Sequence, residues 1–302
     1  MLQKITRRKI QITLGLVWLL DGALQLQRQM FTSNFANKVL LPVSLGHPRI
    51  VSSPMHFEIR LILSHPALWD GLFALVQLTL GVLILVKKTN KVGLIASVFW
   101  ALGVWSLGEG LAGMLSWHST LFMGLPGAAL IYAILALAVL PNKDNNKPAY
   151  WLPIIWASLW ILGTIYLLLP GQNSPADSSQ MLSRMTSGAP RWISFLDEHS
   201  AAMIGHMGFW FVAVVAIIQI IVGLFVFFPN NYRKSAIYVG IGASVIYWVL
   251  GQQLGGYFTG VATDPNSGPL FILLGVAILG SDWLPMKQLW KKIKNDVSKI
   301  LI

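Results

Sequence analysis

The sequence predicts an all-α integral membrane protein with eight transmembrane helices, built as two parallel-repeat four-helix bundles with capping helices on the exterior side. Three observations predict this class. The 302 residues are 55% hydrophobic and only 11% charged, whereas soluble domains carry about 25% charged residues. Apolar runs recur at the length of about 20 residues that a membrane span requires. The second half of the chain also repeats the pattern of the first.

The predicted spans follow from these apolar runs in chain order. They lie near residues 10–28, 67–86, 92–113, 122–140, 150–170, 208–228, 235–257 and 268–285. Polar breaks separate them at Lys87–Lys91, Asn142–Lys147 and Asn230–Lys234. The first run follows a basic start but is long and lacks a small-residue cleavage signature, so we expect a retained span and no signal peptide.

The distribution of lysine and arginine predicts the orientation. Most of the 22 basic residues fall at the two chain ends or in the loops after the second, fourth and sixth spans. The positive-inside rule therefore places both termini in the cytoplasm of a cell-membrane protein. Basic loops against an anionic leaflet explain the net charge of +11, so we expect the lipid bilayer as partner and no nucleic acid.

An internal repeat predicts the domain organisation. A shift of 142 positions superimposes Pro48 and Gly81 on Pro190 and Gly223, and a shift of 143 superimposes residues 105–113 on 248–256. We predict a first four-helix membrane repeat at 1–142, a second at 143–286, and a basic cytoplasmic tail at 287–302. Each repeat has an even number of spans, so both have the same orientation. Exterior segments at 29–66 and 171–207 are too long for plain connections, and we expect them to form short amphipathic helices.

Three acidic residues within the predicted spans are candidate site residues: Asp21, Asp70 and Glu109. Acids are costly inside a membrane and commonly mark functional sites. The predicted topology places all three toward the exterior, where we expect one outward-opening cavity. The polar counterpart of Glu109 in the second repeat is Gln252, whereas Gly163 stands opposite Asp21. The alternative is structural: Asp70 caps its own helix, and Asp21 pairs with Arg28 or another interfacial donor.

Histidine and methionine residues gather in the predicted exterior segments. His199, Met203 and His206 share one helix face, with Met207 adjacent, because residues three or four apart stack on a helix. Imidazole and thioether ligands suit copper, and histidine pairs also serve as haem ligands or proton carriers. Further exterior ligands are available at His47, His56, His65 and His118. The alternative is that methionines at this spacing simply pack. Cysteine is absent, which excludes disulfides and thiolate sites.

The repeat unit resembles a known membrane family. Its first helix contains Leu14-Gly15-Leu16 and Gly22, its second contains Gln77 and Gly81, and a short basic turn leads to a glycine-rich third helix. This arrangement resembles the DoxX/DoxD-like four-helix family, whose members include a membrane subunit of thiosulfate:quinone oxidoreductase. The resemblance implies a quinone-linked redox role. The chain departs from the family by its tandem duplication and long exterior segments, and no catalytic residue carries over.

Three classes of function remain open from the sequence. The leading expectation is a quinone-linked redox or metal-handling membrane subunit with an extracytoplasmic-facing site and other redox subunits as partners. A proton-coupled transporter of a small solute or ion is the first alternative, and a non-catalytic scaffold in a membrane complex is the second. No P-loop, dinucleotide fingerprint, nucleophile elbow or zincin motif is present in the sequence, so the chemistry, enzymatic or not, is expected at the membrane boundary.

Overall fold

The computed structural model describes residues 5–117, 119–142, 146–170, 174, 176, 179, 190–229, 231–282 and 284–300. Over these residues the secondary structure is helical, with no strand. Four helical segments are long and apolar enough to cross a membrane: Pro66–Leu85, Asn90–Gly108, Phe209–Phe227 and Asn231–Gly251. The prediction of an all-helical chain with membrane-length apolar helices is therefore confirmed for the described residues, and the number of eight spans stays a prediction.

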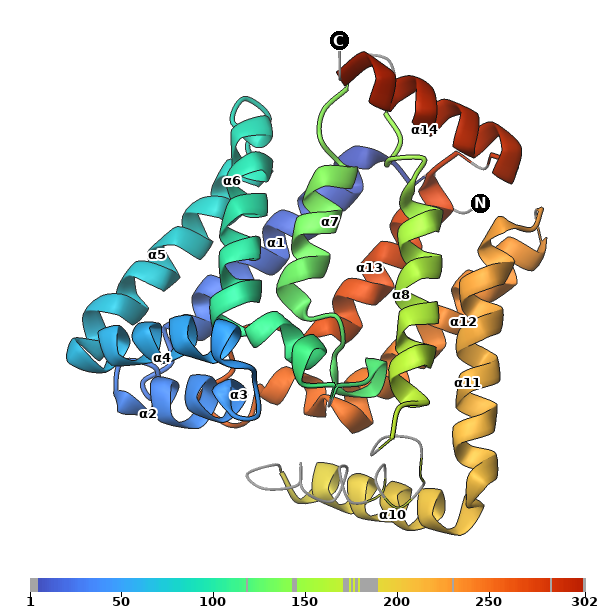
Figure 1. The fold of residues 1–302 in the computed structure, drawn as a ribbon. Coiled ribbons are helices and arrows are strands. Elements are labelled where there is room, and N and C mark those ends of the chain that lie inside the picture. The colour runs from blue at the N-terminus through green and yellow to red at the C-terminus, as the bar shows by residue number, and fades with distance from the viewer. Residues whose placement is uncertain are drawn as a thin grey trace.

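The helices form a central group with a pair on each side (Figure 1). The central group consists of α1 (Arg7–Gln25), α7 (Ala128–Ala138), α8 (Leu152–Leu167) and α13 (Ser267–Gly280). The flanking helices are α5 (Pro66–Leu85) and α6 (Asn90–Gly103) on one side, and α11 (Phe209–Leu224) and α12 (Asn231–Ile246) on the other. Helices from both halves of the chain thus share one centre.

Further helices and helical turns cover one end of this bundle, which we call the capped end (Figure 1). They are α2 (Ser33–Phe35), the π-helical turn η1 (Ala36–Leu40), α3 (Leu41–Ser44), α4 (Arg49–Ser64) and α10 (Arg191–Met207). Helix α4 is amphipathic and buries Val51, Met55, Ile59 and Ile62. Both chain ends and α14 (Met286–Ile300) lie at the opposite end, which we call the terminal end.

Apolar side chains occupy both the inside and the outside of the bundle. The central helices bury Leu14, Leu135, Trp156 and Leu274 completely. On the flanking helices, Phe99, Phe209 and Trp210 are each more than 70% exposed. Exposed apolar surface on this scale fits lipid contact better than water. The shorter α7, α8 and α13 are shielded at the centre, and the longer flanking helices present the surface for lipid.

Glycines allow close packing between neighbouring helices. A Cβ atom on Gly81 of α5 would lie 2.8 Å from the carbonyl oxygen of Gly15 in α1. In the second half, a Cβ atom on Gly223 of α11 would lie 3.4 Å from the carbonyl oxygen of Ala157 in α8. Small residues at such positions let helix backbones approach without a gap. These glycines therefore have a packing role.

Two helices end earlier than the predicted spans at 92–113 and 235–257. After α6, a π-helical turn η2 (Val104–Gly108) leads into the 3₁₀ segment η3 (Gly110–Ser116). After α12, η6 (Tyr247–Gly251) leads into η7 (Gln253–Gly256) in the same way. Both breaks contain left-handed backbone, with φ of 57° at Leu111 and 55° at Leu254. Left-handed residues with side chains cost about 1–2 kcal/mol each, so neighbouring contacts must offset the cost.

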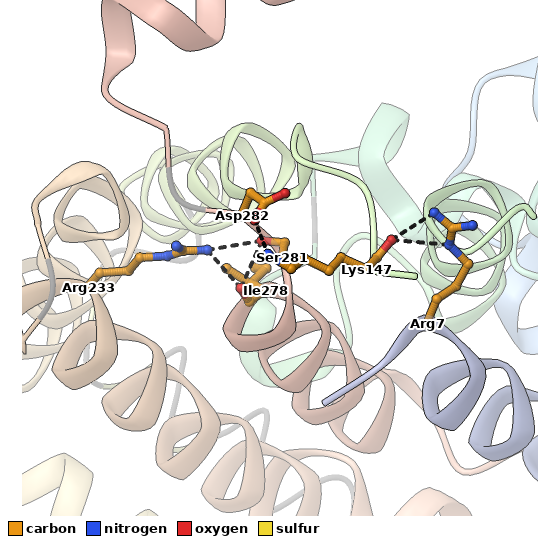
Figure 2. Close-up of polar contacts among 6 residues, drawn as sticks. All are labelled: Arg7, Lys147, Arg233, Ile278, Ser281 and Asp282. Carbon is orange, nitrogen blue, oxygen red and sulfur yellow. Dashed lines mark hydrogen bonds and ion pairs between the residues drawn. The ribbon is translucent and has the colours of Figure 1, made fainter. Parts of the chain in front are cut away.

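Polar contacts tie the terminal end together (Figure 2). The Arg7 guanidinium donates to the carbonyl oxygen of Lys147 at 3.0 Å, and the Lys147 ammonium pairs with Asp282. Arg233 donates to the carbonyl oxygen of Ile278 at 2.7 Å and to Ser281 Oγ at 3.0 Å. These contacts link α1, α12, the end of α13 and the segment that joins the two halves of the chain. The two halves of the chain are thereby joined by polar contacts at the terminal end.

We predict that Gly81→Val separates α1 from α5 and destabilises the protein by about 1–3 kcal/mol through overpacking. The midpoint of thermal unfolding in detergent checks this. Gly242→Val in α12 is the matched control, because a Cβ atom there has no neighbour within 4 Å. Equal midpoints for the two variants would contradict close packing at Gly81.

Candidate functional site

A cavity of about 720 Å³ lies toward the capped end of the first half of the chain. Its walls come from α1, α5, the α6–η2–η3 segment, α7, residues 35–47 and Glu58 of α4. One segment of the second half, residues 263–266, also reaches the wall. Cavities of 300–1,000 Å³ are typical of small-molecule sites. This cavity is therefore the candidate functional site.

The charge of the cavity wall is one-sided. The described residues that line it include four carboxylic acids, Asp21, Glu58, Glu109 and Asp264, and neither lysine nor arginine. The whole chain carries 22 basic and only 11 acidic residues, so composition alone predicts the opposite. Carboxyl groups without a basic partner hold protons or attract cations. The wall is thus suited to binding protons or a cation and unsuited to binding an anion.

Asp21 projects from α1 into the cavity and is 1% exposed. Its Oδ2 accepts a hydrogen bond from the Tyr132 hydroxyl of α7, and Tyr132 packs on Trp18 with ring centroids 4.3 Å apart. Its Oδ1 is buried without a hydrogen-bond partner. The hydrogen-bond donor to Asp21 is therefore a tyrosine, where the sequence suggested Arg28 as one option. One oxygen remains available to a ligand.

Glu109 stands at the break between η2 and η3 and contacts the start of α7. Its Oε1 accepts a hydrogen bond from the backbone N–H of Ala129 at 3.0 Å. Helix α7 begins after Gly127, which offers no side-chain cap, so Glu109 supplies one from another segment. Trp105 also stabilises this junction, because its Nε1 donates a hydrogen bond to the Pro126 carbonyl oxygen at 2.7 Å. The second oxygen of Glu109 is buried without a partner.

Gln252 makes the corresponding contact in the second half. Its Oε1 accepts from the backbone N–H of Gly268 in the first turn of α13 at 2.9 Å. Trp248 Nε1 donates to the Pro265 carbonyl oxygen at 2.8 Å, as Trp105 does to Pro126. A neutral amide is therefore sufficient to cap the helix. The capping role explains why residue 109 has a hydrogen-bond acceptor, but it does not explain why that acceptor is an acid.

Two acids of the wall, Asp264 and Glu58, are not among the site residues predicted from the sequence. Asp264 belongs to the loop before α13, where its Oδ2 accepts from the Thr263 hydroxyl and its Oδ1 from the Asn266 N–H, each at 2.7 Å. It interacts electrostatically with Asp21 and Glu109. Burial raises the pKa of Asp264 above its ordinary value, and burial raises the pKa of Glu58 in α4 to about 7. Of these two acids, Glu58 is therefore the one whose pKa lies near neutral pH.

The corresponding space in the second half is filled. Gly163 of α8 takes the place of Asp21, and a Cβ atom there would lie 2.2 Å from the side chain of Leu121. Leu121 is 2% exposed. The adjacent Phe122 packs against Tyr247 with ring centroids 5.7 Å apart. Leu121 and Phe122 of the first half therefore fill the space beside Gly163 in the second half with apolar side chains. In the first half, the matching space beside Asp21 belongs to the acidic cavity.

Asp70 does not line the cavity with the other two predicted acids. It is fully buried in α5, and neither carboxylate oxygen has a hydrogen-bond partner. The suggestion that it caps its own helix is wrong, because no side chain caps α5. The structure gives Asp70 no role at this site.

The described histidines of the first half have different surroundings. His47 lines the cavity, His56 Nε2 contacts Ser44 Oγ at 3.2 Å, and His65 is exposed between α4 and α5. His118 lies outside the described residues. Within the described chain, no group of three or more His, Cys, Asp or Glu side chains is arranged to hold a metal ion.

The predicted metal cluster is on the exposed face of α10. The side chains of His199, Met203, His206 and Met207 are all exposed. His199 Nδ1 donates to the Phe195 carbonyl oxygen at 2.8 Å. This face does not line the cavity, so the buried acids and the histidine–methionine cluster are separate features.

We predict different effects for two substitutions of Glu109. Glu109→Gln keeps an acceptor for the Ala129 N–H, as the native Gln252 does, and should change stability little. Glu109→Leu removes the cap and should destabilise the protein by about 1–2 kcal/mol. Thermal unfolding of both variants in detergent checks this. The capping role fails if the glutamine variant is as unstable as the leucine variant.

None of the family models, curated proteins or solved structures compared with the chain matches it. The DoxX/DoxD-like resemblance therefore stays a prediction, and the function must be inferred from the geometry of the cavity.

Proposed function

We propose that the protein is a proton-coupled transporter of a small solute in the cell membrane, with the cavity as its solute site. The observation that carries this proposal is the wall of four acids with neither lysine nor arginine. Buried acids without basic partners are costly in a membrane protein and are typical of proton-relay and coupling groups. Proton and solute would then compete for the same carboxyl groups.

The proposed topology has eight spans in two parallel repeats, 1–142 and 143–286, with both termini in the cytoplasm. Matching local structures support the repeat. Helices α4 and α10 both begin after a proline, at Pro48 and Pro190. The breaks after η2 and η6, the paired tryptophan contacts and the caps from Glu109 and Gln252 occur in the same order. Basic residues at the terminal end support the orientation.

In this topology the cavity faces the exterior. The capped end, where the cavity lies, is the extracytoplasmic end, and the contacts of Arg7 and Arg233 close the cytoplasmic end. The described conformation then corresponds to an outward-facing state. Movement of the solute to the cytoplasm requires those contacts to open.

Asp21 is the proposed coupling group. It is 1% exposed, it receives one hydrogen bond from Tyr132, and its other oxygen has no partner. A buried carboxylate with so few partners is costly, and the cost falls when the group takes up a proton or when a cation binds beside it. Its protonation state should therefore change when the solute binds.

A quinone-linked redox subunit is the second candidate, and the apolar part of the wall favours it. Trp18, Phe73 and Trp100 line the cavity. Leu45 and Phe99, at 67% and 72% exposure, also belong to the wall and reach the surface. A lipophilic ring would find a route from the bilayer, and the carboxyl groups would accept hydrogen bonds from the hydroxyl groups of a quinol. Solvent extraction of the purified protein, followed by absorption spectroscopy, tests for a bound quinone.

We predict that solute-driven proton movement depends on Asp21. The protein is reconstituted into liposomes with a pH-sensitive dye inside, and a panel of small solutes is added. Asp21→Asn should abolish the proton movement, because the amide cannot take up a proton. Asp70→Asn, a buried acid outside the cavity, is the matched control and should retain it.

Two results would count against transport. One is proton movement that Asp21→Asn leaves unchanged. The other is a stoichiometric quinone in the purified protein together with no proton movement for any solute, which would favour the redox subunit.

A further inference from the structure

The wall of the cavity restricts the class of molecule that can bind. Four of the 11 acidic residues of the chain lie on it, together with none of the 22 basic residues among those described. A bound anion would meet only like charge from these groups. Neither lysine nor arginine is among the described residues of the wall to compensate it, so an anionic ligand is disfavoured.

Three acidic side chains of the wall each have one oxygen without a hydrogen-bond partner. Asp21 Oδ1, Glu58 Oε2 and Glu109 Oε2 are all buried without a hydrogen-bond partner. Their other contacts are made within the protein, as between Asp21 and Tyr132 and between Glu109 and Ala129. Buried polar atoms in native proteins are normally paired. Free oxygens from three different helical segments therefore point to a ligand with positive charge or hydrogen-bond donors.

Aromatic rings complete the wall. Trp18 and Tyr132 lie beside Asp21, and Phe73 packs near Trp100 with ring centroids 5.8 Å apart. The faces of such rings attract cations, and aromatic surroundings with a carboxylate are a recurrent means of binding ammonium groups. The rings also offer contact area to an apolar body. Acid and aromatic groups together favour a cation that carries apolar substituents.

Size separates an organic cation from a metal ion. A volume of about 720 Å³ is far larger than a single ion requires. Within the described chain, no three His, Cys, Asp or Glu side chains are arranged to coordinate a metal. The exposed apolar side chains of Leu45 and Phe99 at the edge of the wall also suit a molecule that arrives from the membrane interface.

From these observations we infer that the cavity binds an amphiphilic organic cation, a protonated or quaternary amine with an apolar body. The inference rests on the proposed function, which makes this cavity the solute site. The ammonium group lies among Asp21, Glu109 and Asp264, and the apolar body lies against Trp18, Phe73 and Trp100. Binding of the cation releases a proton from the acidic wall to water, and departure of the cation restores it.

The experiment compares three probes of similar size on the full-length protein in lipid nanodiscs. The probes are benzyltrimethylammonium as the cation, 2,2-dimethyl-1-phenylpropane as its neutral isostere and phenylmethanesulfonate as an anion. Binding is followed by tryptophan fluorescence, since Trp18 and Trp100 line the cavity. We expect saturable binding of the cation at least tenfold tighter than of the neutral isostere, and no binding of the anion.

Three variants locate the binding. Asp21→Asn keeps an acceptor for Tyr132, and Glu109→Gln is matched by the native Gln252, so both should fold. Each should weaken binding of the cation by tenfold or more and leave the neutral isostere unaffected. Asp70→Asn should bind the cation as the native protein does.

The outcomes separate this inference from the proposed function. Equal binding of the cation and its neutral isostere, or cation binding that neither Asp21→Asn nor Glu109→Gln weakens, overturns the inference. If no probe binds while an uncharged solute drives Asp21-dependent proton movement, the inference fails and the proposed function stands. If no probe binds and no solute of the panel drives proton movement, both fail.

Discussion

The hydrogen bond between Glu109 and the first turn of α7 fixes the geometry on which the cavity depends. Helix α6 and its π-helical extension end at Gly108, and the chain then turns through left-handed residues that cost free energy. Backbone groups inside a membrane protein need internal partners, since lipid offers none. The carboxylate of Glu109 and the indole of Trp105 supply them at the start of the next helix. Residues 108–113 are thereby held as one wall of the cavity.

The same construction in the second half produces a different result. Gln252 and Trp248 hold the corresponding break, so the backbone arrangement does not require a charge. What differs is the segment that enters each space. Asp264 of the second half reaches the cavity in the first half, whereas Leu121 of the first half fills the space beside Gly163. The two spaces therefore differ in the side chains that enter them.

Hydropathy could predict the helical membrane class and most helix positions, because apolar runs and polar breaks are local features. Asp21 and Glu109 could be singled out because a charge within an apolar run is conspicuous. Glu58 and Asp264 could not, because acids are ordinary in polar segments. Asp264 reaches the cavity only through the tertiary fold. The helix breaks at Gly108 and Gly251 were missed as well, since glycines that pack helices and glycines that end them give the same sequence pattern.

The proposed function requires the acidic cavity to open to the exterior of the cell. The chain has no cysteine, so single cysteines report position directly. Ser116→Cys places a thiol in the cavity wall and Lys88→Cys places one on the turn between α5 and α6. In sealed right-side-out vesicles, a membrane-impermeant maleimide should label Ser116→Cys at once and Lys88→Cys only after permeabilisation. Labelling of Lys88→Cys in sealed vesicles, with Ser116→Cys protected, would contradict an exterior opening.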